Sequence, residues 1–551
     1  MKIQRLRIQN FRRFEDVTID FPELTTSLVG MNGSGKTTVI DALNTLMALY
    51  SPESKVAIDD FYDSSKPIKI AAELDEFYFI EIEDGWSKRT LPSKLLALTI
   101  DHRGASGQKV FNSPYTASYL MVPHVYNDAS TLGLQAAEVA TTPGKIYKSG
   151  ENYKFSRTSG GDGNVGQLQL SSINHATGLP STFYFDGTRE KELKHGFSTL
   201  WSKLVEELDW RYFKKYLEVD EATKDSFLEG VKATKATIDK TTTGSRRKDV
   251  IDELVKQAKG LLGEKYADLE IAYINPERPH KRSELALHWT DKIISLDKMG
   301  AGERAVLAFI LSVIVAKHSK NPIIILVDEM ETHLHPQLML SLREYLENEG
   351  VQIIYTTHSE NLIDLGRWKS IKRLGDGKIF PEKSTLDQDV EGKKLREHLD
   401  DISMYYLDKT ILKMEDAQIL FGSKALLVEG PNDKYCLPVA SAKIGKDISG
   451  MATILATNGK TKMPHYQVIC TAFGIEHFAV YDKDEASNSS ETAKNNRITS
   501  LTTHSFGFDP SFEAVIGKHN MADIMNEIES NNIPQQVKDC IEAVHTWKEE
   551  P

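Results

Sequence analysis

The sequence predicts an α/β protein of at least two domains, with buried parallel strands in more than one of them. Residues 323–327 form a short aliphatic run, IIILV, which is typical of a strand buried on both faces of a parallel sheet. Apolar strands alternate with helical stretches again from 425–428 to 477–481, where a second α/β unit is expected. At 551 residues the chain is also too long for a single hydrophobic core.

Composition and charge are those of an ordinary globular protein. The 67 basic and 79 acidic residues leave a net charge of −12, so any contact with nucleic acid must use local basic patches or metal ions. The N-terminal residues alternate and carry charge, unlike a signal peptide, and no apolar run approaches the roughly 18 residues of a membrane span. The three cysteines form no metal-spaced cluster and suggest no disulfide. We therefore expect a cytoplasmic protein with no membrane partner.

A phosphate-binding loop is predicted near the N-terminus. After alternating strands at 3–8 and 17–21, a third strand at 27–29 leads into GMNGSGKTT, and an apolar helical stretch follows. This is G-x-x-x-x-G-K-T between a strand and a helix, in which glycines let backbone N–H groups surround phosphates. The Lys36 ammonium should reach the β- and γ-phosphates and the Thr37 hydroxyl should ligate Mg²⁺. The expected nucleotide contacts in this loop are Gly30, Asn32, Gly33, Gly35, Lys36, Thr37 and Thr38.

Two strand ends offer the other groups of a nucleotide site. Asp328 and Glu329 directly follow the strand at 323–327, at the carboxyl end where open α/β sheets bind ligands. The aspartate there can hold Mg²⁺ on ATP, and the glutamate can polarise the water that attacks the γ-phosphate. The next strand, 351–355, runs into His358, whose ring can bond the γ-phosphate. The alternative is two solvated acids and a structural histidine.

The region between these motifs is predicted to contain strands, a linker and helices. Residues 68–82 and 95–100 should form strands of an antiparallel flank. Residues 143–180 are rich in Gly, Ser, Asn and Thr and are interpreted as a linker. From about 185 to 285 we expect a helical insertion.

Within that insertion, apolar residues recur at helical spacing, so the helices should pack on each other or on a second subunit, where they would dimerise the chain. The residues that carry this spacing are Leu254, Ala258, Leu261 and Leu262. The basic cluster 246–248 is more typical of a solvated loop than of a DNA contact.

A Gly-x-Gly segment lies one helix before the acidic strand. It is part of LDKMGAGER, residues 296–304, and could be only a turn and a helix cap. Its position resembles the signature loop of ABC-type ATPases, which sandwich ATP between two subunits. That resemblance implies that Gly300, Gly302 and Glu303 contact a partner's nucleotide, and hence a homodimer or higher oligomer. Gly300 replaces the serine usual in that loop, so one side-chain hydrogen bond would be missing.

The second α/β unit carries carboxylates at its strand ends. Glu429 follows the strand at 425–428, Asp433 opens the next helix, and Asp482 and Asp484 end the strand at 477–481. Carboxyl ends of parallel strands meet at one edge, so these oxygens can converge on one or two hard divalent ions. Such ions can activate water against a phosphodiester. The alternative is unrelated surface carboxylates.

Several motifs together resemble known families. NFRRF, GMNGSGKTT, MGAGER, VDEMETHLHP and TTHS resemble ABC-type ATPases of the SMC and RecF kind, and LHP at 334–336 resembles the overcoming-lysogenisation-defect (OLD) subgroup. EGPND, TNG and YDKD resemble the Rossmann-like TOPRIM domain, whose acidic positions match the four carboxylates above. The resemblance implies that Arg12 lies near the nucleotide and that Glu513, in DPSFE, serves a second metal. It also implies a late lysine, either Lys518 or Lys538.

The resemblance implies a domain order and a function. An ABC/SMC-like ATPase domain (1–380) would precede a helical connector (381–423) and a TOPRIM nuclease domain (424–551). ATP and Mg²⁺ are the expected cofactors, with Mn²⁺ or Ca²⁺ also possible at the nuclease site. The protein would be a DNA endonuclease or nickase, as in Gabija-type and retron-linked anti-phage effectors, with a reverse transcriptase and its DNA product, or a helicase, as partner.

Two alternatives remain open. One is an SMC/RecF-like DNA repair ATPase whose TOPRIM domain only binds. A primase-like or topoisomerase-like enzyme has less support, because the chain has no zinc-binding cysteine set and no obvious nucleophilic-tyrosine domain.

Overall fold

The chain forms two compact units. The first comprises residues 1–26 and 37–357, and the second comprises 27–36 and 358–551. The computed structural model describes residues 1–48, 55–84, 87–102, 115–123, 144–149, 152–157, 162–164, 168–170, 176–185, 242–273, 283–289, 292–295, 298–318, 322–409, 414–450, 452–484 and 489–549.

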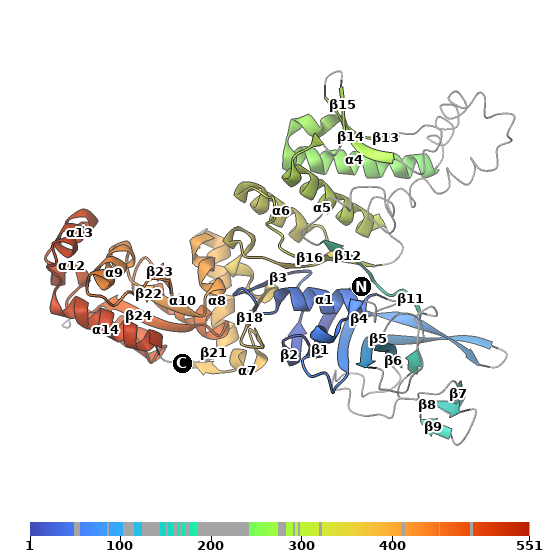
Figure 1. Cartoon of the computed structure of the whole chain (residues 1–551), viewed down its shortest axis with the longest axis horizontal. Helices are drawn as coiled ribbons and strands as arrows, with labels where there is room; N and C mark the ends of the chain where they lie inside the picture. Colours follow the sequence, from blue (N-terminus) through green and yellow to red (C-terminus); the bar gives the residue numbers. More distant parts are fainter. Residues whose placement is uncertain are drawn as a thin grey trace. The chain divides into compact units, whose positions relative to one another are not determined.

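An antiparallel sheet begins the first unit, in the order β10-β6-β5-β4-β1-β2 with β11 on β4 (Figure 1). In β1 the side chains of Ile3, Leu6 and Ile8 are buried while those between them are more exposed, as the alternation predicts. The expected strands and the antiparallel flank are confirmed. The strands are β1 (Ile3–Phe11), β2 (Phe14–Asp20), β4 (Ile68–Asp84), β5 (Ser87–His102), β6 (Tyr115–Pro123), β10 (Leu168–Leu170) and β11 (Ala176–Thr177). A short 3-10 helix, η2 (Ile58–Asp60), precedes β4.

The interpretation of residues 143–180 as a linker is wrong for the parts that the structure describes. Besides β10 and β11, three strands form a separate antiparallel sheet: β7 (Gly144–Ser149), β8 (Asn152–Arg157) and β9 (Asp162–Asn164). The run NYKF alternates polar and aromatic residues, which favours a strand, and the Gly- and Ser-rich stretches lie between the strands.

The first unit also holds a parallel layer, in the order β12-β16-β17. Its strands are β12 (Ser181–Phe185), β16 (Ile323–Val327) and β17 (Gln352–Thr356), and β16 and β17 are buried throughout. Helices of the same unit include α1 (Lys36–Leu46), α5 (Ala301–His318) and α6 (Pro336–Asn348), and α5 contacts β16. Most of α5 is apolar and buried, and α6 begins at Pro336, a residue suited to a first helical turn.

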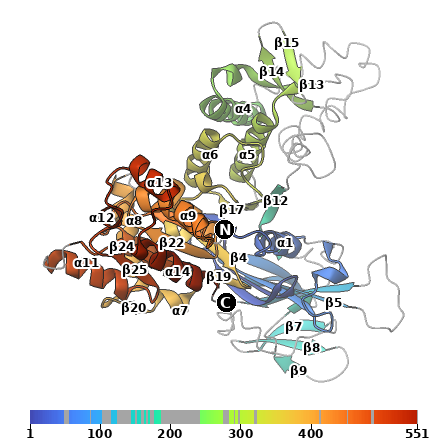
Figure 2. The ribbon, with the colours of Figure 1, turned by 60° about the vertical axis from the view of Figure 1, so that its left-hand side comes forward.

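The predicted helical insertion is only partly helical. Residues 186–241 lie outside the described residues. Helix α4 (Thr242–Leu262) is present and contacts α5 and α6 (Figure 2), and Leu254 and Ala258 are buried. Residues 246–248 belong to this helix rather than to a loop.

Beyond α4 the helical prediction is wrong. After the 3-10 helix η6 (Glu264–Asp268), an antiparallel sheet follows in the order β13-β14-β15. Alternating runs such as SELALHW explain the strands, which are β13 (Leu269–Tyr273), β14 (Ser283–Trp289) and β15 (Lys292–Ser295).

The second unit contains the strand that leads into the phosphate loop. Strand β3 (Thr25–Gly30) pairs in parallel with β18 (Ile371–Gly375), which pairs antiparallel with β19 (Lys378–Phe380). Two 3-10 helices, η9 (Glu360–Leu362) and η10 (Leu365–Ser370), precede β18.

The second unit also contains a four-stranded parallel sheet, in the order β23-β22-β24-β25. Strands β22 and β24 lie where strands were predicted, β23 falls within the strand–helix alternation predicted between them, and the short β25 was not predicted. The strands are β22 (Lys424–Val428), β23 (Thr453–Ala456), β24 (Glu476–Asp482) and β25 (Ser505–Phe508). The helices are α9 (Pro431–Lys443), α10 (Met463–Ala472), α11 (Ser489–Ser500), α12 (Phe512–Ile516), α13 (Met521–Glu529) and α14 (Gln535–Glu549).

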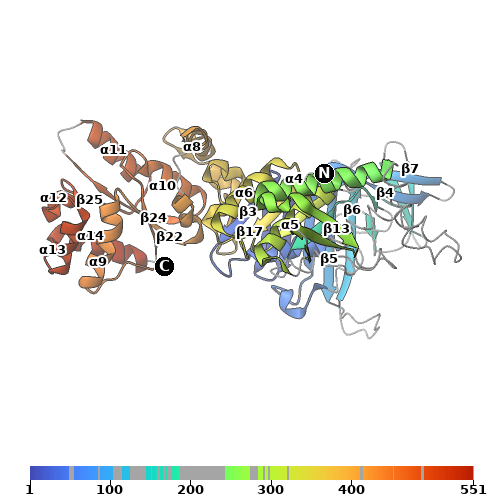
Figure 3. The ribbon, with the colours of Figure 1, turned by 90° about the horizontal axis from the view of Figure 1, so that it is seen from above.

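Helices cover both faces of this sheet (Figure 3). Leu427 and Tyr481 pack in a core with α10, whereas the alternate residues Leu426 and Val480 pack with α9, α13 and α14. Burial on both faces explains why these strands are continuously apolar.

The segment predicted as a helical connector, 381–423, contains helices and also a two-stranded antiparallel sheet, and it shares a core with the four-stranded sheet. Leu395, Leu399 and Ile419 are fully buried in the same cluster as Leu427. It is therefore not a free spacer. Its elements are α7 (Lys383–Leu386), β20 (Asp389–Val390), β21 (Lys393–Lys394), α8 (Leu395–Lys409) and the 3-10 helix η11 (Met414–Phe421).

All three cysteines, Cys436, Cys470 and Cys540, are free and buried. None of the described helices has the length and apolar character needed to cross a membrane.

Candidate functional site

The phosphate loop joins β3 to α1 and depends on glycine. Gly30, Gly33 and Gly35 have φ of +135°, +73° and +103°, a region that other residues rarely adopt. A Cβ on Gly30 would lie 2.3 Å from the carbonyl oxygen of Leu374, so this position has no room for a side chain. Asn32 and Gly33 are exposed at the loop, where a ligand can reach their backbone.

Lys36 folds back over its own loop. Its Nζ donates to the carbonyl oxygens of Gly30 and Met31, at 2.9 Å each, and the residue is 6% exposed. Phosphate oxygens are stronger acceptors for an ammonium than these neutral carbonyls. The lysine is thus held inside the loop whose backbone would surround a phosphate.

Thr37 and Asp328 come together as the sequence predicts for Mg²⁺ ligands. The Thr37 Oγ1 donates to the two Asp328 carboxylate oxygens at 3.2 and 3.3 Å. Thr356, at the end of β17, also donates to Asp328 Oδ1, at 2.6 Å. A carboxylate and a hydroxyl are oxygen donors that suit Mg²⁺, so the residues present fit this ion. Thr38, by contrast, is buried in α1.

Glu329 stands on a strained turn. Its φ is +50°, its side chain is exposed, and its backbone N–H donates to Thr356 Oγ1 at 2.8 Å. A non-glycine residue in this region costs energy, and such strain often accompanies a functional position. The same threonine hydroxyl therefore fixes both Asp328 and the backbone of the candidate catalytic acid.

The signature loop at the start of α5 is bonded within its own chain. The Gly300 N–H donates to Glu303 Oε2 at 3.0 Å, and Lys265 pairs with the other carboxylate oxygen. Burial opposes ionisation of Glu303, but these bonds outweigh it and lower its pKa. A Cβ on Gly302 would lie 2.4 Å from the His333 carbonyl oxygen, so packing alone already requires glycine there.

Arg12 and His358 also have partners in their own units. The Arg12 guanidinium donates to Asp60 at 2.7 Å and to Asp41 of α1 at 2.5 Å. The exposed His358 ring stacks on Phe421, with 6.4 Å between centroids. A nucleotide contact by either residue stays a prediction.

The second unit gathers four of the five predicted carboxylates at one end of its sheet. Glu429 directly follows β22, and its Oε2 accepts from the N–H of Asp482, the last residue of β24, at 3.0 Å. Asp482 Oδ1 accepts from the Phe512 N–H of α12 at 2.9 Å. The adjoining residue of α12, Glu513, accepts from Asn432 in the first turn of α9 at 2.8 Å.

Burial and neighbouring negative charges raise the pKa of three carboxylates at this end of the sheet. Burial, followed by the charges of Glu429, Glu513 and Asp484, raises the pKa of Asp482 to about 7. Burial, reinforced by the charge of Asp482, raises the pKa of Asp433 well above its ordinary value, and burial also raises that of Glu429. The full set of ionised carboxylates is thus unfavourable unless a cation compensates it.

Asp433 supplies an observation that fits a metal ion. It is 4% exposed, and its Oδ2 accepts from the Gly430 N–H at 2.9 Å, while its buried Oδ1 has no hydrogen-bond partner. An unpaired buried carboxylate oxygen is costly, and a divalent ion would satisfy it. Among the described residues, no three acidic, histidine or cysteine side chains are yet gathered closely enough to enclose an ion.

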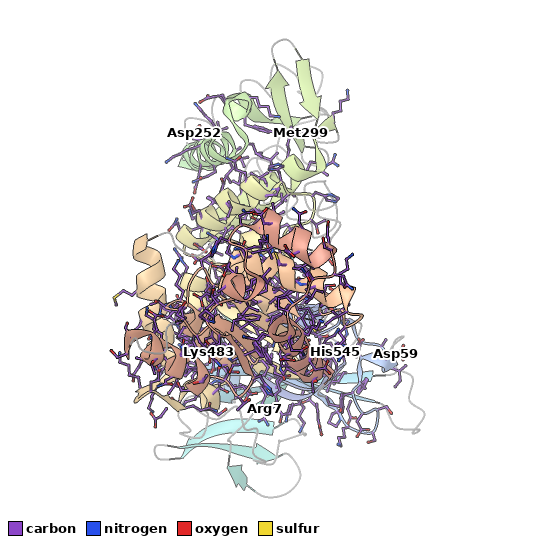
Figure 4. The ribbon with its side chains drawn as sticks, turned by 90° about the vertical axis from the view of Figure 1, so that its left-hand side faces the viewer. Arg7, Asp59, Asp252, Met299, Lys483 and His545 are labelled. Carbon is purple, nitrogen blue, oxygen red and sulfur yellow. The ribbon has the colours of Figure 1, made fainter. Side chains whose placement is uncertain are left out.

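Asp484 is placed differently from the other four. It has φ +54°, and its Oδ2 accepts from Lys460 Nζ at 2.6 Å, which also donates to Glu491 at 3.0 Å. Sequence reasoning missed Lys460 and Glu491, although Lys460 directly follows the TNG turn after β23, next to the strand end that carries Glu429. Figure 4 labels Lys483, the residue between the two aspartates.

Of the two candidate late lysines, Lys518 is bonded to this site through its backbone, because its N–H donates to the Glu513 carbonyl oxygen at 3.1 Å. Lys518 pairs with Glu527 at 3.2 Å, and Lys538 is exposed on α14. The choice between them stays open.

Comparisons with known proteins find relatives for the two domains that carry these residues. A family model described as AAA ATPase domain matches residues 1–363, and one described as overcoming lysogenization defect protein-like, TOPRIM domain matches 420–484. The OLD nuclease of Thermus scotoductus is 21% identical over 587 residues, 98% of each chain. The Old nuclease of Escherichia phage P2 is 27% identical over 179 residues, 31% of this chain and 30% of its own.

Solved structures with similarity include two heads of Smc proteins. The SmcHead bound to the C-winged helix domain of ScpA has a TM-score of 0.35 at 14% identity, over 69% of this chain and 96% of its own. The Smc head domain with an extended coiled coil, bound to the C-terminal domain of ScpA from Pyrococcus furiosus, has a TM-score of 0.33 at 14% identity, over 73% and 99%.

Proposed function

Because this chain belongs to the AAA ATPase domain family and continues into an OLD-like TOPRIM domain, we propose that it is an ATP-controlled, divalent-metal-dependent DNA endonuclease or nickase. The observation that carries the nuclease proposal is Asp433, whose buried Oδ1 is unpaired and whose pKa is raised by burial and then by the charges of neighbouring carboxylates. An arrangement of this kind is costly as pure structure and useful as a metal site.

In the ATPase, each group has a separate task. Lys36 would bind the β- and γ-phosphates, together with the backbone of Gly30, Asn32, Gly33, Gly35 and the residues up to Thr38. Thr37 and Asp328 would hold Mg²⁺, and Glu329 would orient the attacking water. Arg12 and His358 would add contacts to the nucleotide.

In the nuclease, Glu429, Asp433, Asp482, Asp484 and Glu513 would hold one or two ions, Mg²⁺ by preference and Mn²⁺ or Ca²⁺ as alternatives. Their oxygens are the ligands hard cations prefer. A bound ion would supply an activated water and stabilise the charge that develops on the phosphodiester. The Asp482 backbone N–H donates to the Glu429 carboxylate, and this hydrogen bond keeps the two side chains at neighbouring strand ends.

The test pairs two assays on the same preparations. Asp482→Asn and Asp484→Asn should abolish nicking of supercoiled plasmid with Mg²⁺ or Mn²⁺ and leave phosphate release from ATP largely intact. Each change removes a charged ligand and keeps the size of the side chain. Cleavage equal to wild type in both variants would place the nuclease elsewhere or in a contaminant.

A second candidate function is a DNA-binding repair ATPase with a non-catalytic TOPRIM domain. The lack of a tight three-ligand cluster among the described residues favours it. Wild-type protein that never cuts DNA, even with its natural partner, would support this alternative.

We also propose that the chain works as a homodimer or higher oligomer in the cytoplasm. The signature loop, with Gly300, Gly302 and Glu303, supports this because such a loop acts on a partner's nucleotide. Light scattering with and without ATP should show an assembly, and a strict monomer in both states would refute it.

The proposed role is anti-phage defence, with DNA and either a reverse transcriptase with its product or a helicase as partners. The resemblance to Gabija-type and retron-linked effectors supports it. Phage plating on bacteria that express wild type or the Asp482→Asn variant would test it, and equal plating on both would count against defence by cleavage.

A further inference from the structure

A buried lysine, Lys460, contacts the candidate nuclease site and has no role in the proposed function. The Lys460 side chain is 4% exposed, and its ammonium lies 2.6 Å from Asp484 Oδ2 and 3.0 Å from Glu491 Oε2. A charge this buried is expensive to desolvate and is retained only when it is paired. Lys460 has two carboxylate partners, and one of them is a proposed metal ligand.

The backbone of Lys460 is attached to the same site. The turn that carries it is bonded to the end of β22: the Thr457 N–H donates to the Val428 carbonyl at 2.8 Å and the Gly459 N–H to the Glu429 carbonyl at 3.0 Å. The Lys460 N–H itself bonds to the Glu429 carboxylate. One residue therefore links a ligand at the end of β22 with a ligand beyond the end of β24.

Glu491 anchors the far side of the ammonium. It lies in the first turn of α11 and also accepts from Lys494 Nζ at 2.6 Å. Asn495, one turn further along, donates to the Lys483 carbonyl at 3.0 Å. Helix α11 thus holds the Asp482–Asp484 segment in two ways. Asn495 bonds to the segment's backbone, and Glu491 binds the Lys460 ammonium that contacts the Asp484 side chain.

Only one oxygen of Asp484 is used in this contact. Oδ2 accepts from Lys460, and the Asp484 N–H is fixed by the Pro510 carbonyl at 2.7 Å. Asp484 is therefore restrained by one bond to its side chain and one to its backbone, and its Oδ1 takes part in neither. Metal-binding carboxylates are commonly oriented by such an outer hydrogen bond, and its loss typically costs about 10–100-fold in affinity or activity.

We propose that Lys460 is a positioning residue of the nuclease, which orients Asp484 toward the ion and is itself held by Glu491. This rests on the proposed function of the carboxylate site. The merely structural alternative is a buried ion pair that stabilises the fold and leaves metal binding alone.

The experiment measures Mn²⁺ binding to the full chain by calorimetry, without nucleotide, beside plasmid cleavage and ATP hydrolysis. Lys460→Met should weaken Mn²⁺ binding and raise the Mn²⁺ needed for half-maximal cleavage by about 10–100-fold. Lys460→Arg should restore part of the loss. Glu491→Gln, the matched control, removes the other partner and should have a clearly smaller effect on Mn²⁺ binding.

A double-mutant cycle separates positioning from stability. Lys460→Met should add little to Asp484→Asn, because it acts through that carboxylate. Unchanged Mn²⁺ affinity in Lys460→Met, or losses that add fully in the double variant, would overturn the proposal. If Lys460→Met does not melt cooperatively, Lys460→Gln takes its place in the same cycle, judged by the same two outcomes.

The two proposals fail in different ways. Wild type that binds Mn²⁺ but never cuts DNA would refute the nuclease, while weaker Mn²⁺ binding by Lys460→Met would still support the positioning role. Wild type that cuts DNA, with Lys460→Met binding Mn²⁺ as tightly, would refute the positioning role alone.

Discussion

The two candidate sites both place an aspartate at the carboxyl end of a parallel strand, but they surround it with different groups. Each places an aspartate directly after or at the end of a parallel strand, Asp328 after β16 and Asp482 at the end of β24. Asp328 is surrounded by hydroxyl donors, from Thr37 and Thr356. Asp482 is surrounded by other carboxylates, and burial and their charges raise its pKa to about 7.

This difference shows how far each site can be assembled before its ion arrives. The hydroxyl groups of Thr37 and Thr356 donate hydrogen bonds to the Asp328 carboxylate, so the site around Asp328 is held together without a cation. Carboxylates repel one another, so the site around Asp482 is complete only when a cation balances them. Ion binding at the second site should therefore contribute more to the stability of the folded chain.

The largest expected effect follows from Asp433→Asn. Plasmid cleavage should fall by at least about 100-fold, since losing a ligand costs no less than losing its outer-shell support. The metal-free protein should meanwhile melt at a higher temperature, because asparagine keeps the side chain's shape and, unlike this buried acid, neither buries a charge nor has to take up a proton on folding. Cleavage assays and melting curves without metal measure the two effects.

Asp523→Asn, on the exposed first turn of α13, is the matched control for this prediction and should change neither quantity appreciably. A lower melting temperature for Asp433→Asn would show that its carboxylate is stabilising as it stands, and the comparison between the two sites would fail.

In the ATPase, Glu329→Gln should slow hydrolysis by about 100-fold or more while ATP still binds, because only the water-orienting carboxylate is lost. Lys36→Ala should instead weaken ATP binding, because it deletes the charge held within the loop. Phosphate release and equilibrium binding of a fluorescent ATP analogue separate the two. Hydrolysis by Glu329→Gln at the wild-type rate would mean that another residue orients the water.

The sequence predicted the elements that carry both sites because their signals are local. The glycine pattern at 30–35 and the apolar runs of β16, β22 and β24 each fix an element and its end within about ten residues. The family of both domains was recognised from these motifs, and the family models match them.

The predictions that failed had weak or misleading local signals. Glycine- and serine-rich composition masked the short strands β7 to β9, and the strong pattern of α4 was extended too far into β13 and β14. Lys460 was missed for another reason. Its partner Glu491 is 31 residues further along the chain and Asp484 is 24, so only the folded sheet brings them together.

Thr356→Val tests the hydroxyl side of the comparison and should have a smaller effect. The change keeps the side chain's shape and removes the group that joins Asp328 Oδ1 and the Glu329 N–H. ATP hydrolysis should fall by about 10-fold, with more Mg²⁺ needed for half-maximal rate. Thr357→Val is the control, because that hydroxyl donates to Glu331 instead. Equal losses in both variants would show general damage to the end of β17.

The smallest expected effect is on pH-dependent stability without metal. The pKa of Asp482 is about 7 in the folded chain and about 3.8 when unfolded, so between these values the folded state binds more protons. Stability from this group is therefore full below pH 4 and is lost as pH rises through 7.

Because Asp482→Asn cannot titrate at this position, the melting temperature of wild type minus that of the variant should fall by a few degrees from pH 4 to pH 7.5. Mn²⁺ favours the ionised carboxylate, so adding it at pH 7.5 should raise the wild-type melting temperature more than that of the variant. Scanning fluorimetry of both proteins across this range, with and without Mn²⁺, gives the four curves needed. If the melting temperatures of the two proteins change in parallel with pH and rise equally with Mn²⁺, then Asp482 neither holds its proton in the folded state nor binds the ion. The carboxylate site would then be no more dependent on a cation than the site around Asp328.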